Sequence, residues 1–223
     1  MSTGNIKHLL FNQFARIGKA LSNANRLELI EYLAQGERGV EALAQVSGLS
    51  VANTSQHLQL LKQAGLVAAR KDGQRVYYRL TSKDVVALLG ALRTVADRHL
   101  ADVDQLVRTY LDTRDALEPV SPRDLLQRAR GGEVTVLDVR PAEEFAAGHL
   151  PGAINIPLAE LEQRLGDLDP KQEVVAYCRG PYCVLSYDAV ARLRDRGFAA
   201  RRLQDGYPEW KLAGLPTDVA GES

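Results

Sequence analysis

The spacing of apolar residues changes near residue 112, and this change constrains the fold more than any other feature of the chain. Before it, apolar residues recur every three or four positions, as at Leu10, Phe14, Ile17 and Leu21, which indicates amphipathic helices. After it, the apolar runs 134–137 and 173–177 alternate with helical segments, which is typical of an α/β unit with a parallel sheet. We therefore predict two domains, at residues 1–111 and 121–223, joined by a linker at residues 112–120.

Composition supports a globular protein whose charge is unevenly distributed. The chain is 45% hydrophobic and 25% charged, with no net charge, which argues against global disorder. Residues 1–111 nevertheless hold 14 Lys and Arg against 9 Asp and Glu, and residues 112–223 hold 14 against 19. Residues 50–83 alone hold six bases and one acid. This local excess indicates a polyanionic partner, although a solvated helix face would have the same composition.

Several classes of protein are excluded. The longest apolar run, Val85 to Leu92, is eight residues long, which is too short to span a membrane. The first residues show no secretory pattern, so we expect a cytoplasmic protein with no membrane partner. Only Cys178 and Cys183 are present, which excludes a disulfide scaffold and a four-thiolate zinc site. We expect no cofactor.

Residues 40–65 predict a helix-turn-helix. A helical apolar pattern begins at Val40 and is broken by Gly48; Ser50 then caps a second helix that runs to about Gln63, and Gly65 ends it. Amide and hydroxyl side chains near the start of the second helix can read base edges, and Lys62 can neutralise a phosphate. The predicted DNA contacts on this segment are Ser50, Asn53, Thr54, Ser55, Gln56, His57, Gln59 and Lys62.

A basic hairpin follows the second helix. Residues 67–70 and 75–80 have strand-like composition, and the sequence Lys-Asp-Gly-Gln at 71–74 predicts the turn between them. Cations on this hairpin would lie along a phosphate backbone, as in a DNA-binding wing. The expected contacts are Arg70, Lys71 and Arg75.

Taken together, residues 8–110 resemble the ArsR/SmtB family of winged-helix repressors. The matching stretches are RLELIEYLAQGERGVEALAQVSGLS, SVANTSQHLQLLKQAGLV and RKDGQRVYYRL. The resemblance implies a mainly α-helical winged helix-turn-helix fold and a homodimer built from the first and last helices, at about 8–34 and 82–110. It also implies a protein that binds a double-stranded DNA operator and leaves it when a signal arrives.

Members of this family often sense metals, yet the family's metal sites are incomplete here. The positions of the Cys-x-Cys pair hold Gly39 and Glu41. On the last helix, Asp97 and His99 match half of a second family site, while the other half falls on Tyr110 and Thr113. Two ligands are too few for a zinc ion, which takes four. We therefore expect no metal site.

The second domain places a cysteine where a strand ends. Cys178 directly follows the buried-type strand 173–177 and precedes a helix, which is a common ligand position in open α/β sheets. Inward-pointing backbone N–H groups and the helix dipole would favour a thiolate there, and Arg179 would add a cation. The predicted anion-binding loop comprises Arg179, Gly180, Tyr182, Cys183 and Val184.

Residues 120–217 resemble a single rhodanese (sulfurtransferase) domain. The matching stretches are VTVLDVRPAEEFAAGHLPGAINIP, CRGPYC and DGYPEW. The resemblance implies that Cys178 attacks the sulfane sulfur of thiosulfate or a persulfide and becomes Cys–S–SH. It also implies a six-residue loop suited to sulfur, whereas phosphatase relatives have seven residues. We expect Asp138 and Arg140 to support this loop as a polar pair.

The sixth loop position departs from the family, because Cys183 stands where active sulfurtransferases commonly have arginine. The loss of a cation predicts slow turnover, so whether the domain acts as an enzyme stays open. Cys183 would either resolve a Cys178 persulfide into a disulfide or serve only as a small packed residue.

The sequence leads to three functional hypotheses. The first is a DNA-binding repressor that senses reactive sulfur species through Cys178. The second is a working thiosulfate or persulfide sulfurtransferase whose DNA-binding domain regulates or places it. The third, with less support, is a metal-responsive repressor that uses Asp97 and His99.

Overall fold

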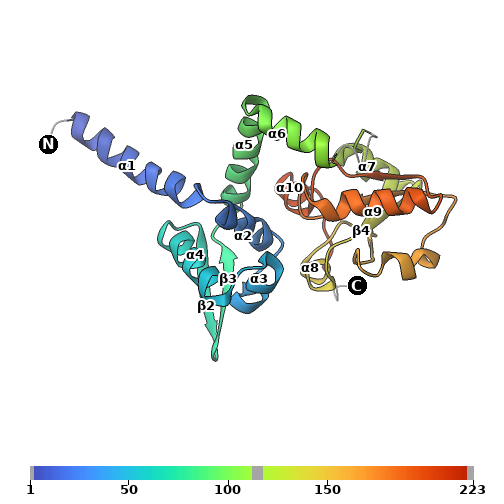
Figure 1. Cartoon of the computed structure of the whole chain (residues 1–223), viewed down its shortest axis with the longest axis horizontal. Coiled ribbons are helices and arrows are strands. Elements are labelled where there is room, and N and C mark those ends of the chain that lie inside the picture. The colour runs from blue at the N-terminus through green and yellow to red at the C-terminus, as the bar shows by residue number, and fades with distance from the viewer. Residues whose placement is uncertain (1–2, 112–117, 220–223) are drawn as a thin grey trace. The chain divides into compact units, whose positions relative to one another are not determined.

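The computed structural model describes residues 3–111 and 118–219, and the chain divides into two compact units, Met1–Leu89 and Gly90–Ser223 (Figure 1). This division falls earlier than the predicted boundary at residue 111. Most of the predicted linker, residues 112–117, lies outside the described residues, as does Thr113. Within the described ranges no helix is long and apolar enough to cross a membrane.

Helices make up most of the first unit. They are α1 (Thr3–Leu21), α2 (Ala24–Ala34), α3 (Val40–Ser47), α4 (Val51–Gln63) and α5 (Asp84–His99), of which α5 continues into the second unit. The segment 8–34 is therefore two helices, because the Asn23 side chain accepts a hydrogen bond from the Arg26 N–H and starts α2. The segment 82–110 is also divided: α6 (Ala101–Leu106) and a π-helical turn (Val107–Leu111) follow α5.

The helix-turn-helix and the hairpin lie where the sequence predicts them. Gly48 ends α3 with a φ of 68°, and the Ser50 side chain caps α4 by accepting from the Asn53 N–H. Strands β2 (Val67–Asp72) and β3 (Arg75–Leu80) are paired as far as Asp72 and Arg75. The turn between them is therefore the two residues 73–74, rather than the predicted four. A short strand, β1 (Arg38–Gly39), which the sequence did not indicate, pairs with β3 and gives the antiparallel order β1-β3-β2.

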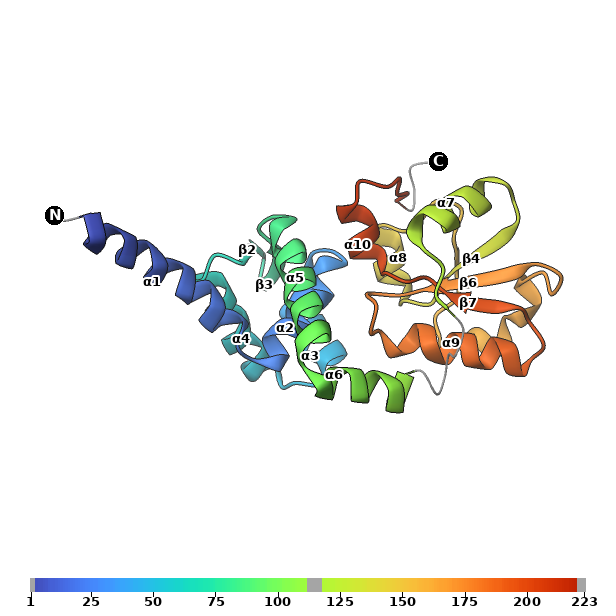
Figure 2. The same cartoon turned by 90° about the horizontal axis from the view of Figure 1, so that it is seen from above.

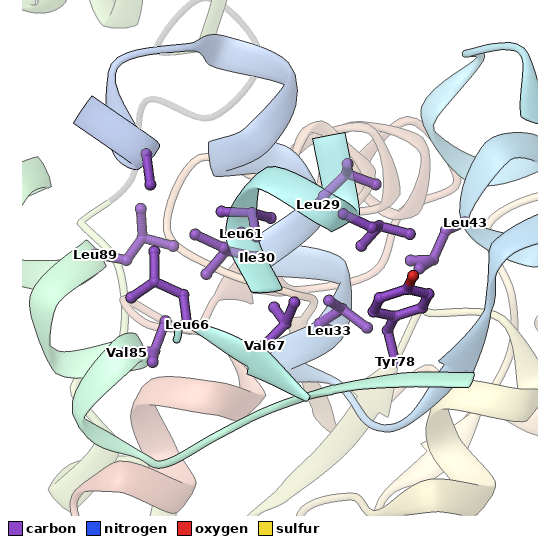
Figure 3. Packing of buried hydrophobic residues seen from close by; sticks show 12 residues of the cluster. Leu29, Ile30, Leu33, Leu43, Leu61, Leu66, Val67, Tyr78, Val85 and Leu89 are labelled. Carbon is purple, nitrogen blue, oxygen red and sulfur yellow. The ribbon is translucent and has the colours of Figure 1, made fainter. Parts of the chain in front are cut away.

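A single hydrophobic cluster holds the first unit together. Leu29, Ile30 and Leu33 of α2 meet Leu61 of α4 and Val67 of β2, and each is less than 5% exposed (Figure 3). Val85 and Leu89 of α5 belong to the same cluster, so this end of α5 is anchored in the core of the first unit.

The second unit is an α/β fold around a four-stranded parallel sheet of order β5-β4-β6-β7. Its strands are β4 (Val134–Asp138), β5 (Ile154–Asn155), β6 (Glu173–Tyr177) and β7 (Ala200–Arg202). Besides the end of α5, α6 and the π-helical turn, this unit contains α7 (Pro122–Arg130), α8 (Ala142–Ala147), α9 (Val184–Asp195) and α10 (Tyr207–Leu212), with short 3₁₀ turns at Leu161–Gln163 and Leu165–Asp167. Ser121 caps α7 and Pro122 begins it, as the sequence predicts.

Alternation along β6 divides the core of this unit into two layers. Val174 and Ala176 pack with α9, whereas Val175 and Tyr177 pack with α7 and α10. Figure 2 shows α9 and α7 on opposite sides of the sheet. Cys178, the residue after β6, packs on the α9 side of the sheet, as the alternation of side chains along the strand requires. The loop that follows β6 therefore begins on the side of the sheet where α9 lies.

Candidate cysteine loop and DNA interface

The loop between β6 and α9 contains both cysteines, and the structure joins them. Cys178 is buried at the end of β6, Cys183 is the N-cap residue of α9, and their Sγ atoms form a disulfide. The two Cα atoms are 6.1 Å apart, within the usual range for a disulfide. The structure thus shows the oxidised form of the pair, and a low pKa of the Cys178 thiol stays a prediction for the reduced form.

Residues from a distant segment hold this loop in place. The Tyr207 N–H donates to the Cys178 carbonyl oxygen at 3.1 Å. Gly206 lies so close to the loop that a Cβ there would be 2.3 Å from the Gly180 nitrogen and 2.4 Å from the Arg179 carbonyl carbon. The contact explains why the stretch DGYPEW accompanies the cysteine loop, since its glycine permits the approach of two backbones.

Arg179 has a different environment from the one the sequence suggested. Its Nε lies 3.0 Å from both carboxylate oxygens of Glu144, and its Nη2 lies 2.7 Å from Oε1. The Glu144 side chain is fully buried and that of Arg179 is 10% exposed. The guanidinium is thus held by α8, so Arg179 is better described as a residue that positions the loop than as a free cation beside the thiol. Its partner lies 35 residues away, where no local pattern could identify it.

Asp138 and Arg140 form the polar pair that the sequence predicted. Both side chains are fully buried; Arg140 Nη2 donates to Asp138 Oδ2 at 2.6 Å and to the Gly148 carbonyl oxygen at 2.8 Å. The guanidinium also lies 4.5 Å from the centroid of the Tyr207 ring. The pair therefore connects the end of β4 to the residue whose N–H holds the Cys178 carbonyl.

Tyr182, inside the loop, contacts the second half of α5. Its hydroxyl donates to Asp97 Oδ1 at 2.5 Å. Burial and this hydrogen bond both raise the pKa of Tyr182 above its ordinary value, which keeps the phenol protonated as a donor. Asp97 thus has a partner within the chain, and the described residues contain no group of three or more His, Cys, Asp and Glu side chains placed to hold a metal.

The predicted DNA-contact residues on α4 fall into two groups. Gln56 and Lys62 are exposed, and Asn53 and Ser55 are half-buried, so these four remain available to a DNA groove. A groove of about 340 Å³ runs from Val51 and Ser55 of α4 to residues 74–77 at the tip of the hairpin. This groove joins the start of α4 to the wing, the two elements that the sequence assigned to DNA.

Other predicted contacts have roles inside the unit. Thr54 is fully buried and its hydroxyl donates to the Ser50 carbonyl oxygen, so it does not face DNA; the sequence prediction is corrected here. Gln59 donates to the Tyr78 hydroxyl at 3.0 Å, which connects α4 to β3. His57 Nε2 lies 3.5 Å from the Asn25 amide nitrogen. Ser50 serves as the helix cap described above.

The wing cations differ in how they are engaged. Lys71 and Arg75 are exposed, as a phosphate contact requires. Arg70 is exposed too, but it bonds Glu37 Oε1 at 2.7 Å and Asp72 Oδ2 at 3.1 Å. DNA phosphates would have to compete with these carboxylates for Arg70.

Comparison with known proteins agrees with both units. Residues 23–69 match the family described as bacterial regulatory protein, arsR family, and residues 121–213 match the rhodanese-like domain. The chain is 50% identical over 212 residues to the HTH-type transcriptional regulator Rv0324 of Mycobacterium tuberculosis, covering 95% of this chain and 93% of that protein. It is 41% identical over 76 residues to the nodulation protein NolR of Rhizobium meliloti, covering 34% of this chain and 62% of that protein.

Solved structures resemble each unit separately. The homodimeric winged helix-turn-helix DNA-binding domain Mb0332 from Mycobacterium bovis is 46% identical with a TM-score of 0.42, covering 45% of this chain and 93% of that one. A rhodanese-related protein from Thermoplasma volcanium is 26% identical with a TM-score of 0.42, covering 46% of this chain and 99% of that one. The relationship to Rv0324 extends over nearly the whole of both chains. This chain therefore belongs to the ArsR family of transcriptional regulators, with a C-terminal rhodanese-like domain.

Proposed function

We propose that this ArsR-family regulator is a repressor that senses reactive sulfur species through Cys178, with Cys183 as the resolving thiol. The observation that carries the proposal is the placement of both sulfur atoms within bonding distance inside one six-residue loop, in a chain that also has a DNA-binding unit. A sulfane-sulfur donor, either thiosulfate or a persulfide, is the proposed signal.

The chemistry takes place in two balanced steps. The Cys178 thiolate attacks the outer sulfur of a persulfide RSSH, giving Cys178–S–SH and the thiolate RS⁻. The Cys183 thiolate then attacks the Sγ atom of Cys178, forming the Cys178–Cys183 disulfide and releasing hydrosulfide. The sulfane sulfur of the donor is the oxidant in this sequence, and a reducing thiol later returns both cysteines to the reduced form.

We expect the repressor to bind double-stranded DNA as a homodimer. Large apolar side chains on α1 and α5 are exposed in the monomer, and a second copy would cover them. On α1 these are Ile6, Leu9, Leu10, Phe11 and Phe14, each 48–62% exposed, and on α5 they are Leu88, Leu92 and Val95. In such a dimer, α4 and the wing of each protomer would contact one half of an operator.

Mass spectrometry combined with a mobility-shift assay tests the proposal. The reduced full-length protein is treated with a persulfide donor, and binding to DNA from its own promoter is measured before and after treatment. We expect wild type to acquire a disulfide and lose DNA affinity, Cys178→Ser to do neither, and Cys183→Ser to stop at the persulfide with the mass of one added sulfur atom. Equal DNA affinity with and without the donor would refute sensing.

A working sulfurtransferase is the second candidate, supported by the match of residues 121–213 to the rhodanese-like domain. A thiosulfate:cyanide assay separates the two functions. Sustained turnover favours the enzyme, whereas a single round that ends in the disulfide favours the sensor. The metal-responsive alternative loses support because Asp97 is engaged by Tyr182.

A further inference from the structure

We propose that α5 responds to the redox state of the cysteine loop through two side-chain contacts, Tyr182 with Asp97 and Glu209 with Arg93. This inference rests on the proposed function, because it supplies the physical connection between the sulfur chemistry and the DNA-binding unit. It places that connection on α5 itself.

The first contact starts between the two cysteines. Tyr182 immediately precedes Cys183, and its hydroxyl donates to Asp97 on α5. The disulfide holds the Cα atoms of Cys178 and Cys183 at 6.1 Å. Reduction removes that restraint from a loop of only six residues. Because Tyr182 is bonded directly to Cys183, we expect its position to change when the disulfide is broken.

The second contact reaches the opposite part of the loop through α10. Arg93 Nη1 donates to Glu209 Oε1 at 2.9 Å, and the Gly206 N–H donates to Glu209 Oε2 at 3.2 Å. Gly206 in turn packs against the backbone of Arg179 and Gly180. The Arg93 and Glu209 side chains are 19% and 20% exposed, so the pair is mostly shielded from water and is screened less than a surface ion pair.

The spacing of residues on α5 joins these contacts to the DNA-binding core. Val85, Leu89, Arg93 and Asp97 follow one another at four-residue steps on one continuous helix, and side chains four apart are neighbours on a helix surface. Val85 and Leu89 are buried in the core of the first unit, and Arg93 and Asp97 hold the loop. Rigid secondary-structure elements can carry coupling between two sites, so we expect a change at the loop to affect the other end of α5.

Asp97 is also one of the two residues that match the family's metal site on this helix. Here its carboxylate accepts the Tyr182 hydroxyl. The carboxylate that would be needed as a metal ligand is thus already bonded to a side chain of the cysteine loop.

Hydrogen–deuterium exchange of the full-length protein tests the inference. Amide exchange in Gly90–His99 is compared between the disulfide form and the form reduced with excess dithiol. We expect reduction to change exchange there in wild type, and Tyr182→Phe and Asp97→Ala, which remove the donor and the acceptor of this hydrogen bond, each to abolish most of the difference. Tyr110→Phe and Asp102→Ala are the matched controls, since both residues are exposed, and they should behave as wild type.

The same variants should alter the chemistry of the loop, because coupling between two sites is reciprocal. We expect Tyr182→Phe and Asp97→Ala to shift the equilibrium constant for disulfide formation by about fivefold or more, the lower end of typical allosteric coupling. We also expect the double variant to shift it no further than either single variant, because both remove one interaction. Asp97→Ala alters an exposed residue, so it tests the contact even if Tyr182→Phe disturbs the loop.

The outcomes separate this inference from the proposed function. If amide exchange in α5 changes on reduction in wild type and not in the variants, the inference holds. It holds even if DNA affinity is the same in both forms, an outcome that would refute only the proposed function. If exchange in α5 is the same in both forms of wild type, the inference is overturned. It is likewise overturned if the variants respond as fully as wild type, even where a persulfide donor still releases DNA.

Discussion

The buried Arg179–Glu144 pair gives a large and specific prediction for the stability of the second unit. Glu144→Ala removes a carboxylate that is 0% exposed and leaves the Arg179 guanidinium, 10% exposed, without that partner. Breaking a buried pair from one side typically costs about 3–5 kcal/mol. Because most domains are stable by only ~5–15 kcal/mol, we expect Glu144→Ala to lose a large part of the stability of this unit.

The measurement uses an intrinsic probe. Trp210 is the only tryptophan in the chain, and it is buried in the second unit, so its fluorescence during urea unfolding follows that unit alone. Glu143→Ala is the matched control, because Glu143 is exposed on the same helix, and we expect it to change stability by less than about 0.5 kcal/mol. A loss below about 1 kcal/mol for Glu144→Ala would show that Arg179 is readily rehydrated, and would refute the argument that the pair is a fixed support of the loop.

Three further predictions test other parts of the molecule. Gly206→Ala places a Cβ 2.3 Å from the Gly180 nitrogen; it should displace the cysteine loop and destabilise the second unit by urea unfolding, whereas Gly166→Ala, in open space, should not. Burial opposes ionisation of Glu173, but hydrogen bonds from Arg201 and Arg128 outweigh it and lower its pKa. The stability that Glu173 contributes is thus present above its ordinary pKa of ~4.3 and is lost as pH falls through the lowered value; Glu173→Gln should flatten the loss of stability in acid. Lys71→Gln on the exposed wing should reduce the slope of log affinity against log salt by about 2, because the dimer loses one phosphate contact from each protomer; an unchanged slope would remove Lys71 from the DNA interface.

The sequence predicted those parts of the fold that have local causes. Gly48 and Ser50 determine the turn of the helix-turn-helix within three residues of each other, through a left-handed backbone and a helix cap. The position of Cys178 follows in the same way from the apolar strand before it and the helix after it. Such signals are contained in a few neighbouring residues, so no knowledge of distant contacts is needed.

The predictions that needed correction depended on distant contacts or on weak local signals. A polar residue near the start of a helix can face either solvent or the core. Thr54 is fully buried, and its hydroxyl is satisfied there by the Ser50 carbonyl oxygen. The break after α5 lies at Leu100, which has no side-chain capping bond, so the sequence offered no cap to identify it. The partners of Arg179 and Tyr182 lie 35 and 85 residues away, and only the folded chain brings them together.

A cysteine at the sixth loop position changes what sulfur loading can achieve. In a transferase, the persulfide persists until an external acceptor arrives. Here Cys183 lies next to the Cys178 sulfur, so on the proposed function intramolecular attack competes with any external acceptor at a high effective concentration. The resulting disulfide leaves no thiolate for a second round, which limits an enzyme but gives a regulator a lasting change of state.

Replacing this cysteine should therefore move the protein from sensor towards enzyme. We expect Cys183→Ser to turn over more rounds in the thiosulfate:cyanide assay than wild type, because its persulfide can only be discharged by the external acceptor. Mass spectrometry should show the persulfide of Cys183→Ser persisting in the absence of cyanide, where wild type proceeds to the disulfide. Cys178→Ser, which lacks the attacking sulfur, is the blank for both measurements. If Cys183→Ser completed no more rounds of turnover than wild type, disulfide formation would not limit the reaction. Cys183 would then be a packed residue at the start of α9.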